Sequence, residues 1–121
     1  MCGIVGYVGE KQCNKILMNG LRKLEYRGYD SVGIASLNNG LLNVVKKKGR
    51  VATIEKESES ILGNIGIGHT RWSTHGKPSD ENSHPHYTKN FAVVHNGIIE
   101  NYISLKRKLT EKGFEFISET D

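Results

Sequence analysis

The sequence is poor in cysteine, with only Cys2 and Cys13 among 121 residues. Two cysteines are too few for a disulfide-stapled scaffold. No apolar run approaches the roughly 18 residues of a membrane-spanning helix, and the first residues lack the basic leader and apolar stretch of a secretory signal. We therefore expect a cytoplasmic protein without membrane contact, in which both thiols stay reduced.

The sequence also lacks a large excess of charge of one sign, because 17 basic and 13 acidic residues leave a net charge of +4. The basic residues gather at 46–50 and 106–108, but such runs are usually solvated faces, so we expect no nucleic-acid partner. An apolar content of 36% together with 14 glycines is typical of globular proteins and excludes a disordered chain. The length suits one domain.

The hydrophobic pattern predicts mixed, mostly antiparallel α+β packing. The Asn-Asn-Gly at 38–40, flanked by apolar segments, indicates a hairpin. Residues 70–90 show no clean period, and a structureless segment of that length inside a domain is usually functional or mobile. The predicted strands are 3–8, 32–37, 41–45, 65–69, 91–94 and 114–117, and the predicted helices are 14–24, 51–62 and 101–112.

Cys2 is the sharpest candidate for chemistry. Once Met1 is removed, this residue carries both a thiol and a free α-amine. Their ordinary pKa values, about 8.5 and about 8, allow proton exchange near neutral pH. The amine can then serve as general base for the side chain of its own residue. The alternative is an incidental cysteine beside the start methionine.

Two further segments could complete such a site. Arg71, followed by Trp72, Thr74 and His75, offers a guanidinium fork for a carboxylate and an indole that could cover a small molecule. The alternative interpretation of this segment is a surface arginine beside a packed tryptophan. Asn96 and Gly97 leave a predicted strand, where a side-chain amide and a backbone N–H can form an oxyanion hole. The alternative interpretation of Asn96 and Gly97 is an ordinary Asn-Gly turn.

The histidines at 69, 75, 84 and 86 raise the question of a metal, but their spacing matches no compact zinc pattern. We expect them to be hydrogen-bonding members of the loop, with no metal and no cofactor.

Four segments occur in an order that resembles one known family. They are residues 1–6 (MCGIVG), 24–31 (LEYRGYDS), 69–76 (HTRWSTHG) and 94–101 (VHNGIIEN). Together they are similar to the class II glutamine amidotransferases, the N-terminal-nucleophile type. The Tyr-Arg-Gly-Tyr-Asp-Ser and Arg-Trp-Ser-Thr-His-Gly runs resemble the branch that makes glucosamine 6-phosphate from fructose 6-phosphate more than the branch that makes phosphoribosylamine.

The resemblance implies a role for each matching residue. Cys2 would attack the glutamine side-chain amide, and Asn96 and Gly97 would stabilise the oxyanion. Arg71 would hold the substrate α-carboxylate with Thr74 and His75 beside it, and Asp121 would take the α-ammonium. Trp72 would belong to a loop closing over the site. Arg27 would support the nucleophile region.

The resemblance also implies that residues 1–121 are the N-terminal portion of a longer glutamine amidotransferase domain. The family fold is a four-layer αββα sandwich of antiparallel sheets, of which this chain would form a part. A sugar-isomerase part would receive the ammonia, and the full-length protein would be a homo-oligomer. Since half a sandwich leaves strand edges uncovered, we expect the 121 residues alone to be a poor glutaminase. The alternatives are another class II amidotransferase or a catalytically silent fragment.

Overall fold

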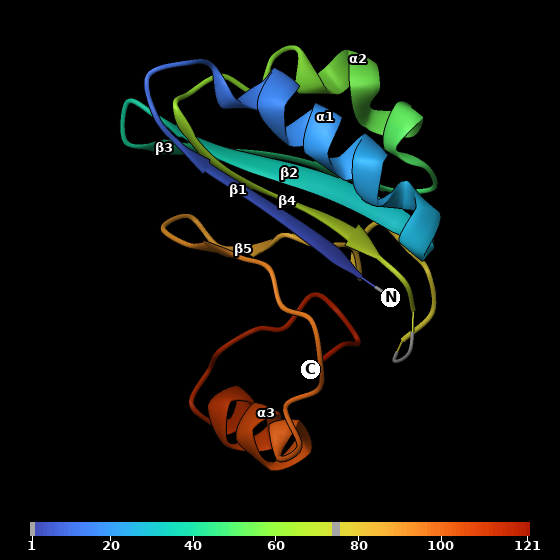
Figure 1. Cartoon of the computed structure of the whole chain (residues 1–121). Coiled ribbons are helices and arrows are strands. Elements are labelled where there is room, and N and C mark those ends of the chain that lie inside the picture. The colour runs from blue at the N-terminus through green and yellow to red at the C-terminus, as the bar shows by residue number, and fades with distance from the viewer. Residues whose placement is uncertain (1, 74–75) are drawn as a thin grey trace.

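The computed structural model describes residues 2–73 and 76–121 (Figure 1). Its strands are β1 (Gly3–Val8), β2 (Ser31–Asn38), β3 (Leu41–Lys48), β4 (Ile65–Arg71), β5 (His86–Tyr87) and β6 (Ala92–Val93). Its α-helices are α1 (Cys13–Leu24), α2 (Glu55–Ser58) and α3 (Tyr102–Glu111), and short 3₁₀ turns are η1 (Glu25–Arg27) and η2 (Val51–Ile54).

The first four strands form one antiparallel sheet in the order β1-β4-β2-β3. The predicted hairpin joins β2 to β3, and its turn places Asn39 at φ 51° and Gly40 at φ 77°, a backbone conformation that Asn and Gly tolerate best. Pairing of β1 with β4 sets Gly3 opposite Thr70, so the start of the chain lies beside the end of β4. The register therefore brings Cys2 next to the segment that follows Arg71.

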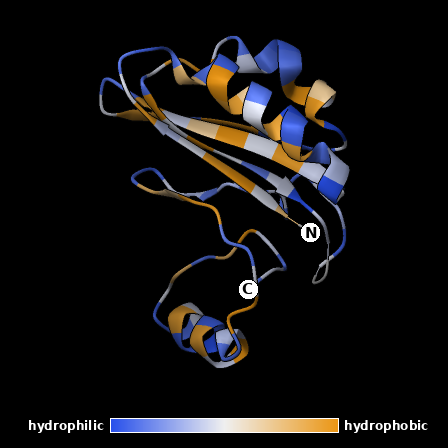
Figure 2. Cartoon of the chain, in the orientation of Figure 1, coloured by the Kyte–Doolittle hydropathy of each residue, from blue (hydrophilic) through white to orange (hydrophobic). Residues whose placement is uncertain are grey.

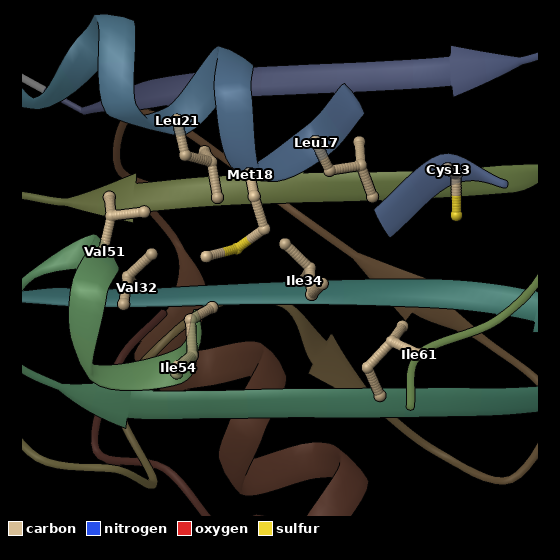
Figure 3. Packing of buried hydrophobic residues seen from close by; sticks show 9 residues of the cluster. All are labelled: Cys13, Leu17, Met18, Leu21, Val32, Ile34, Val51, Ile54 and Ile61. Atoms are coloured by element: carbon tan, nitrogen blue, oxygen red, sulfur yellow. The ribbon is translucent and has the colours of Figure 1, made fainter. Parts of the chain in front are cut away.

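The hydrophobic core lies between this sheet and α1 (Figure 3). Leu17 and Leu21 of α1 are fully buried against Val32 and Ile34 of β2. The helix can approach β4 closely because Gly66 has no side chain, and a Cβ there would stand 2.7 Å from the sulfur of Cys13. Helical and strand periodicities thus meet in one apolar layer, as the sequence pattern predicted.

The opposite face of the four-stranded sheet, here called the inner face, carries Ile65, Ile67, His69 and Arg71 of β4. The small sheet β5-β6 lies below this face, and α3 lies farther out (Figure 1). The layers therefore follow the order helix, sheet, sheet, helix. This is the αββα order expected from the family resemblance, present in part.

Two predicted elements differ from the structure. The single helix expected over 51–62 is η2 followed by the four-residue α2. Ser58 and Ser60 donate their hydroxyls to the carbonyls of Glu55 and Glu57. Residues 114–117 form no strand, and within the described chain they pair with no other strand.

The other predicted elements are confirmed to within a few residues, including α3 at Tyr102–Glu111. In the part of the chain that the structure describes, no helix has the length and apolar character needed to span a membrane.

Candidate active site

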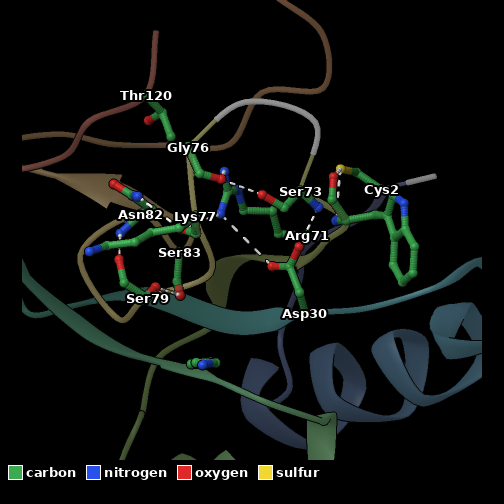
Figure 4. Close-up of polar contacts among 12 residues, drawn as sticks. Cys2, Asp30, Arg71, Ser73, Gly76, Lys77, Ser79, Asn82, Ser83 and Thr120 are labelled. Carbon is green, nitrogen blue, oxygen red and sulfur yellow. Dashed lines mark hydrogen bonds and ion pairs between the residues drawn. The ribbon is translucent and has the colours of Figure 1, made fainter.

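Cys2 immediately precedes β1 and lies beside the end of β4. It is half-buried, and its sulfur accepts a hydrogen bond from the backbone N–H of Trp72 at 3.2 Å (Figure 4). The carbonyl oxygen of Trp72 lies 3.6 Å from the same sulfur and can accept its S–H. The thiol is thus held beside the end of β4 without being enclosed in the core.

Arg71, the last residue of β4, is 4% exposed. Its guanidinium donates to the carbonyls of Gly76 at 3.0 Å and Lys77 at 3.4 Å, and it lies 3.9 Å from an Asp30 carboxylate oxygen. Asp30 also accepts the backbone N–H of Ser73. The strand end, the following loop and the segment before β2 are therefore tied together around one buried positive charge (Figure 4).

Trp72 follows Arg71 and is 49% exposed. Its indole lies over Gly28, where a Cβ would come within 2.8 Å of the ring, and Gly28 has a φ of 102°. Glycine at 28 is needed both for this close approach and for its backbone conformation. Arg27 precedes it at the end of η1 and is half-buried. The segment that carries Arg27 therefore supports the underside of Trp72.

Asn96, in the turn that follows β6, also contacts Cys2. The side-chain NH₂ of Asn96 donates to the Cys2 carbonyl oxygen at 3.3 Å, and the Asn96 side-chain oxygen lies 2.7 Å from Nε2 of His69. Gly97 has a φ of 124°, a conformation that favours glycine. The turn following β6 thus brings a side-chain amide against the residue that carries the thiol.

Asp121 lies next to the same turn. Its carboxylate accepts the backbone N–H of Ile99 at 2.5 Å and lies 4.0 Å from Nδ1 of His95. The structure therefore gathers Cys2, the Arg71–Trp72 strand end, the Asn96–Gly97 turn and Asp121 on one side of the sheet. Thr74 and His75, which the sequence also indicated, lie outside the described residues.

Sequence reasoning missed Asn82, which organises the loop between these parts. Asn82 is 1% exposed, donates to the Lys77 carbonyl at 2.9 Å and accepts the backbone N–H of Glu119 at 2.8 Å. It links the loop that holds Arg71 to the segment that ends in Asp121 (Figure 4). No local motif marks it, because its partners are distant in sequence. Asp30 lies in the segment 24–31, but the sequence does not indicate its pairing with Arg71.

Three histidine rings lie against one another near the site; His69 and His84 are stacked, whereas His84 and His86 are tilted by 58°. The His69 and His84 rings are 4.3 Å apart, and those of His84 and His86 are 4.4 Å apart. Burial, the first cause in each case, lowers their pKa values to about 4 for His69, about 2 for His84 and about 4 for His86. They are therefore neutral at pH 7. Each makes a hydrogen bond as expected, with Asn96, the His95 backbone and Thr120 respectively, although His69 lies on β4 and His86 on β5, not in a loop.

Within the described residues, no group of three or more His, Cys, Asp or Glu side chains is arranged to hold a metal ion.

Comparison with known proteins reveals close relatives over the whole chain. It is 61% identical to glutamine–fructose-6-phosphate aminotransferase (isomerizing) of Caldanaerobacter subterraneus subsp. tengcongensis and 62% identical to that of Clostridium acetobutylicum, matching 100% of this chain in both cases. The chain spans 21% of the length of these relatives. No protein-family model matches it.

Solved structures show the same fold. The glutamine phosphoribosylpyrophosphate amidotransferase of B. subtilis superimposes with a TM-score of 0.83 at 26% identity, over 100% of this chain and 27% of that one. A structure titled as the allosteric regulatory enzyme of purine biosynthesis gives a TM-score of 0.83 at 28% identity, over 98% of this chain and 27% of that chain. By sequence and by fold, the chain thus belongs to the class II, N-terminal-nucleophile glutamine amidotransferases and corresponds to an N-terminal stretch of the glutamine–fructose-6-phosphate aminotransferases.

Proposed function

We propose that this chain hydrolyses the side-chain amide of glutamine through Cys2, and that it is part of a longer protein that uses the ammonia to make glucosamine 6-phosphate from fructose 6-phosphate. One observation carries the proposal. The half-buried Cys2 lies between the Trp72 backbone and the Asn96 amide, in a chain that shares about three-fifths of its residues with aminotransferases of that name.

The nucleophile is the Cys2 thiol, activated by its own α-amine after Met1 is removed. The amine takes the thiol proton as sulfur attacks the carboxamide carbon of glutamine. The amide oxygen becomes an oxyanion, to which the Asn96 side chain and the Gly97 backbone N–H donate. Loss of one such donor typically costs about 10²–10³ in rate.

The proton then passes from the amine to the departing nitrogen, and ammonia leaves. The product that stays on the enzyme is a thioester between Cys2 and the glutamyl carbonyl. Water, deprotonated by the same amine, attacks this carbonyl and releases glutamate, which restores the free thiol. All atoms of glutamine and water are accounted for in ammonia and glutamate, and no cofactor takes part in these steps.

Substrate binding uses opposite charges at the two sides of the site. Arg71 would hold the α-carboxylate of glutamine after a loop carbonyl gives way, with Thr74 and His75 beside it. Asp121 would take the α-ammonium. Trp72, whose indole is half exposed over Gly28, would cover the substrate. Arg27 supports this arrangement through the segment below Trp72.

The relatives' length suggests the remaining partners. Residues 1–121 would be one portion of a single glutaminase domain, and the rest of a longer protein would contain the sugar-isomerase part that receives ammonia. We further propose that this full-length protein is a homo-oligomer in the cytoplasm.

The test is covalent labelling by an electrophilic glutamine analogue, 6-diazo-5-oxo-norleucine, after intact mass spectrometry has shown loss of Met1. We expect one adduct, located on Cys2, and competition by glutamine. Cys13→Ala is the matched control, because Cys13 is fully buried and its burial raises the thiol pKa. This variant should label like the wild type, whereas Cys2→Ala should not label.

Two outcomes would contradict the proposal. No labelling after complete removal of Met1 would favour a catalytically silent fragment. Labelling of Cys2 by the analogue, without glutamine-dependent glucosamine 6-phosphate formation by the full-length protein, would rule out the aminosugar product.

A further inference from the structure

His69 takes no part in the mechanism above, yet it touches the oxyanion-hole residue. It lies on β4, is fully buried, and its Nε2 is 2.7 Å from the side-chain oxygen of Asn96. His84 stacks on one face of its ring at 4.3 Å. The imidazole is therefore held in one orientation by packing.

The direction of the hydrogen bond follows from the other end of Asn96. A carbonyl oxygen can only accept, so the group of Asn96 that meets the Cys2 carbonyl at 3.3 Å must be the NH₂. The Asn96 oxygen is then the atom that faces His69. An amide oxygen can only accept as well, so Nε2 of His69 must carry the hydrogen.

The second ring nitrogen agrees with this assignment. Nδ1 of His69 is buried without a hydrogen-bond partner among the described residues. A buried N–H without an acceptor is costly, so the hydrogen belongs on Nε2. The ring stays neutral near pH 7 because its burial, which lowers the pKa, outweighs the hydrogen bond to Asn96, which raises it; Arg71 and His95 add to the lowering, and Asp30 opposes it.

We propose that His69 is a positioning residue: its Nε2–H fixes the Asn96 side-chain amide so that the NH₂ points toward Cys2. An Asn NH₂ has two hydrogens. One bonds the Cys2 carbonyl, and the other remains for the oxyanion. If the amide rotated by half a turn, its oxygen would face the carbonyl and repel the oxyanion. This inference rests on the proposed glutaminase function.

The test compares three substitutions at one position in the full-length protein. The Gln side-chain nitrogen can occupy the place of Nε2 and donate, whereas the Asn nitrogen reaches only to the place of Nδ1. We expect His69→Ala and His69→Asn to lower kcat for glutamine hydrolysis about 10- to 100-fold, with KM within about threefold of wild type. His69→Gln should recover most of this loss.

Alkylation of Cys2 by iodoacetamide, which forms no oxyanion, should proceed at the wild-type rate in all three variants. Thr70→Val is the matched control. Thr70 is equally buried on the same strand, its side chain points to the opposite face of the sheet, and its hydroxyl has no partner among the described residues. This control should keep the wild-type kcat.

Nitrogen-15 NMR of the imidazoles gives a readout that does not depend on activity. The inference requires the Nε2–H tautomer of His69 at pH 7. An Nδ1–H tautomer, a His69→Ala variant with kcat within twofold of wild type, or equal losses in His69→Gln and His69→Asn would each overturn it. A wild-type protein that does not hydrolyse glutamine overturns the proposed function instead. In that case the tautomer measured by NMR is the test of whether His69 orients Asn96.

Discussion

At the scale of single residues, Asn96 has two bonds that fix its side chain, one to the Cys2 carbonyl and one to His69. We expect Asn96→Ala to lower kcat for glutamine hydrolysis by about 10²–10³ while Cys2 still reacts with iodoacetamide. Steady-state kinetics of ammonia release measure the effect. Asn90→Ala, an exposed asparagine in the β5-β6 turn, serves as control and should leave kcat unchanged. A kcat of Asn96→Ala near the wild-type value would remove this residue from the oxyanion hole.

The three neighbouring histidines His69, His84 and His86 give a second prediction, a loss of stability in acid. Their pKa values in the folded chain lie near 4, 2 and 4, below the ordinary 6.5 that they regain on unfolding. Between about pH 6.5 and pH 4 the unfolded chain therefore binds more protons, and acid favours unfolding. We expect Tm to fall by roughly 5 °C or more over this range.

The matched variant for this prediction is His84→Gln, which removes the histidine with the largest pKa shift. It should make the dependence of Tm on pH shallower between pH 6.5 and pH 4. Thermal unfolding followed by circular dichroism at several pH values measures both slopes. Equal slopes in the two proteins would show that His84 is not the source of the acid sensitivity.

The sequence alone allowed prediction of the residues whose chemistry shows in a short motif, such as Cys2, Arg71 and Asn96. It did not allow prediction of their partners. The Asn96–His69 bond joins residues 27 positions apart, and Asn82 joins segments 37 positions apart. Such contacts depend on sheet order and loop path, which no local pattern encodes. Positioning residues therefore appear only once the fold is known.

At the scale of the elements, the segment around His84 packs directly on the inner face at Gly33. A Cβ added to Gly33 would stand 2.1 Å from the His84 carbonyl oxygen, so β2 and residues 84–85 could not both keep their places. We expect Gly33→Ala to lower Tm by several degrees, on the order of 5 °C, and to raise amide exchange over 82–86. Differential scanning fluorimetry and hydrogen exchange measure the two effects.

Gly6→Ala is the control for this substitution, since Gly6 lies on β1 of the same sheet with no atom within 4 Å of an added Cβ. It should leave Tm near the wild-type value. If both alanine variants lose the same stability, the contact with His84 is not the cause.

Helices and strands were predictable where the pattern was long and regular, as in β1, α1 and the β2-β3 hairpin. The 51–62 region was predicted as one helix because its apolar spacing is helical over the whole segment. In the structure the segment forms η2 and the short α2 instead, and Ser58 and Ser60 bond to the carbonyls three residues before them. The expected strand at 114–117 has the right residues, but strand structure needs a neighbour, and a single sequence segment says nothing about where its neighbour lies.

At the scale of the whole molecule, β5-β6 lies below the inner face of the four-stranded sheet, whose strands carry many hydrophobic residues (Figures 1 and 2). There, Val8, Ile65 and Leu37 form a row across β1, β4 and β2, because Ile65 pairs with both of the others. Their exposed fractions are 79%, 42% and 39%. Contiguous exposed apolar patches of this kind are typical of protein–protein contact surfaces.

We expect this row to make the 121 residues self-associate when they are produced alone, since nothing in the described chain covers it. Ile65→Lys lies at the centre of the row, and its charge should oppose face-to-face packing, so the variant should elute later and as a narrower peak in size-exclusion chromatography with light scattering. Leu41→Lys is the control. Leu41 is 68% exposed at the β2-β3 turn, outside the row, and its replacement should leave association unchanged. A monodisperse wild-type monomer, or equal effects of the two lysine variants, would show that this row does not drive association. In the full-length protein the same Ile65→Lys change should instead lower stability, because there the row would be buried against the rest of the domain.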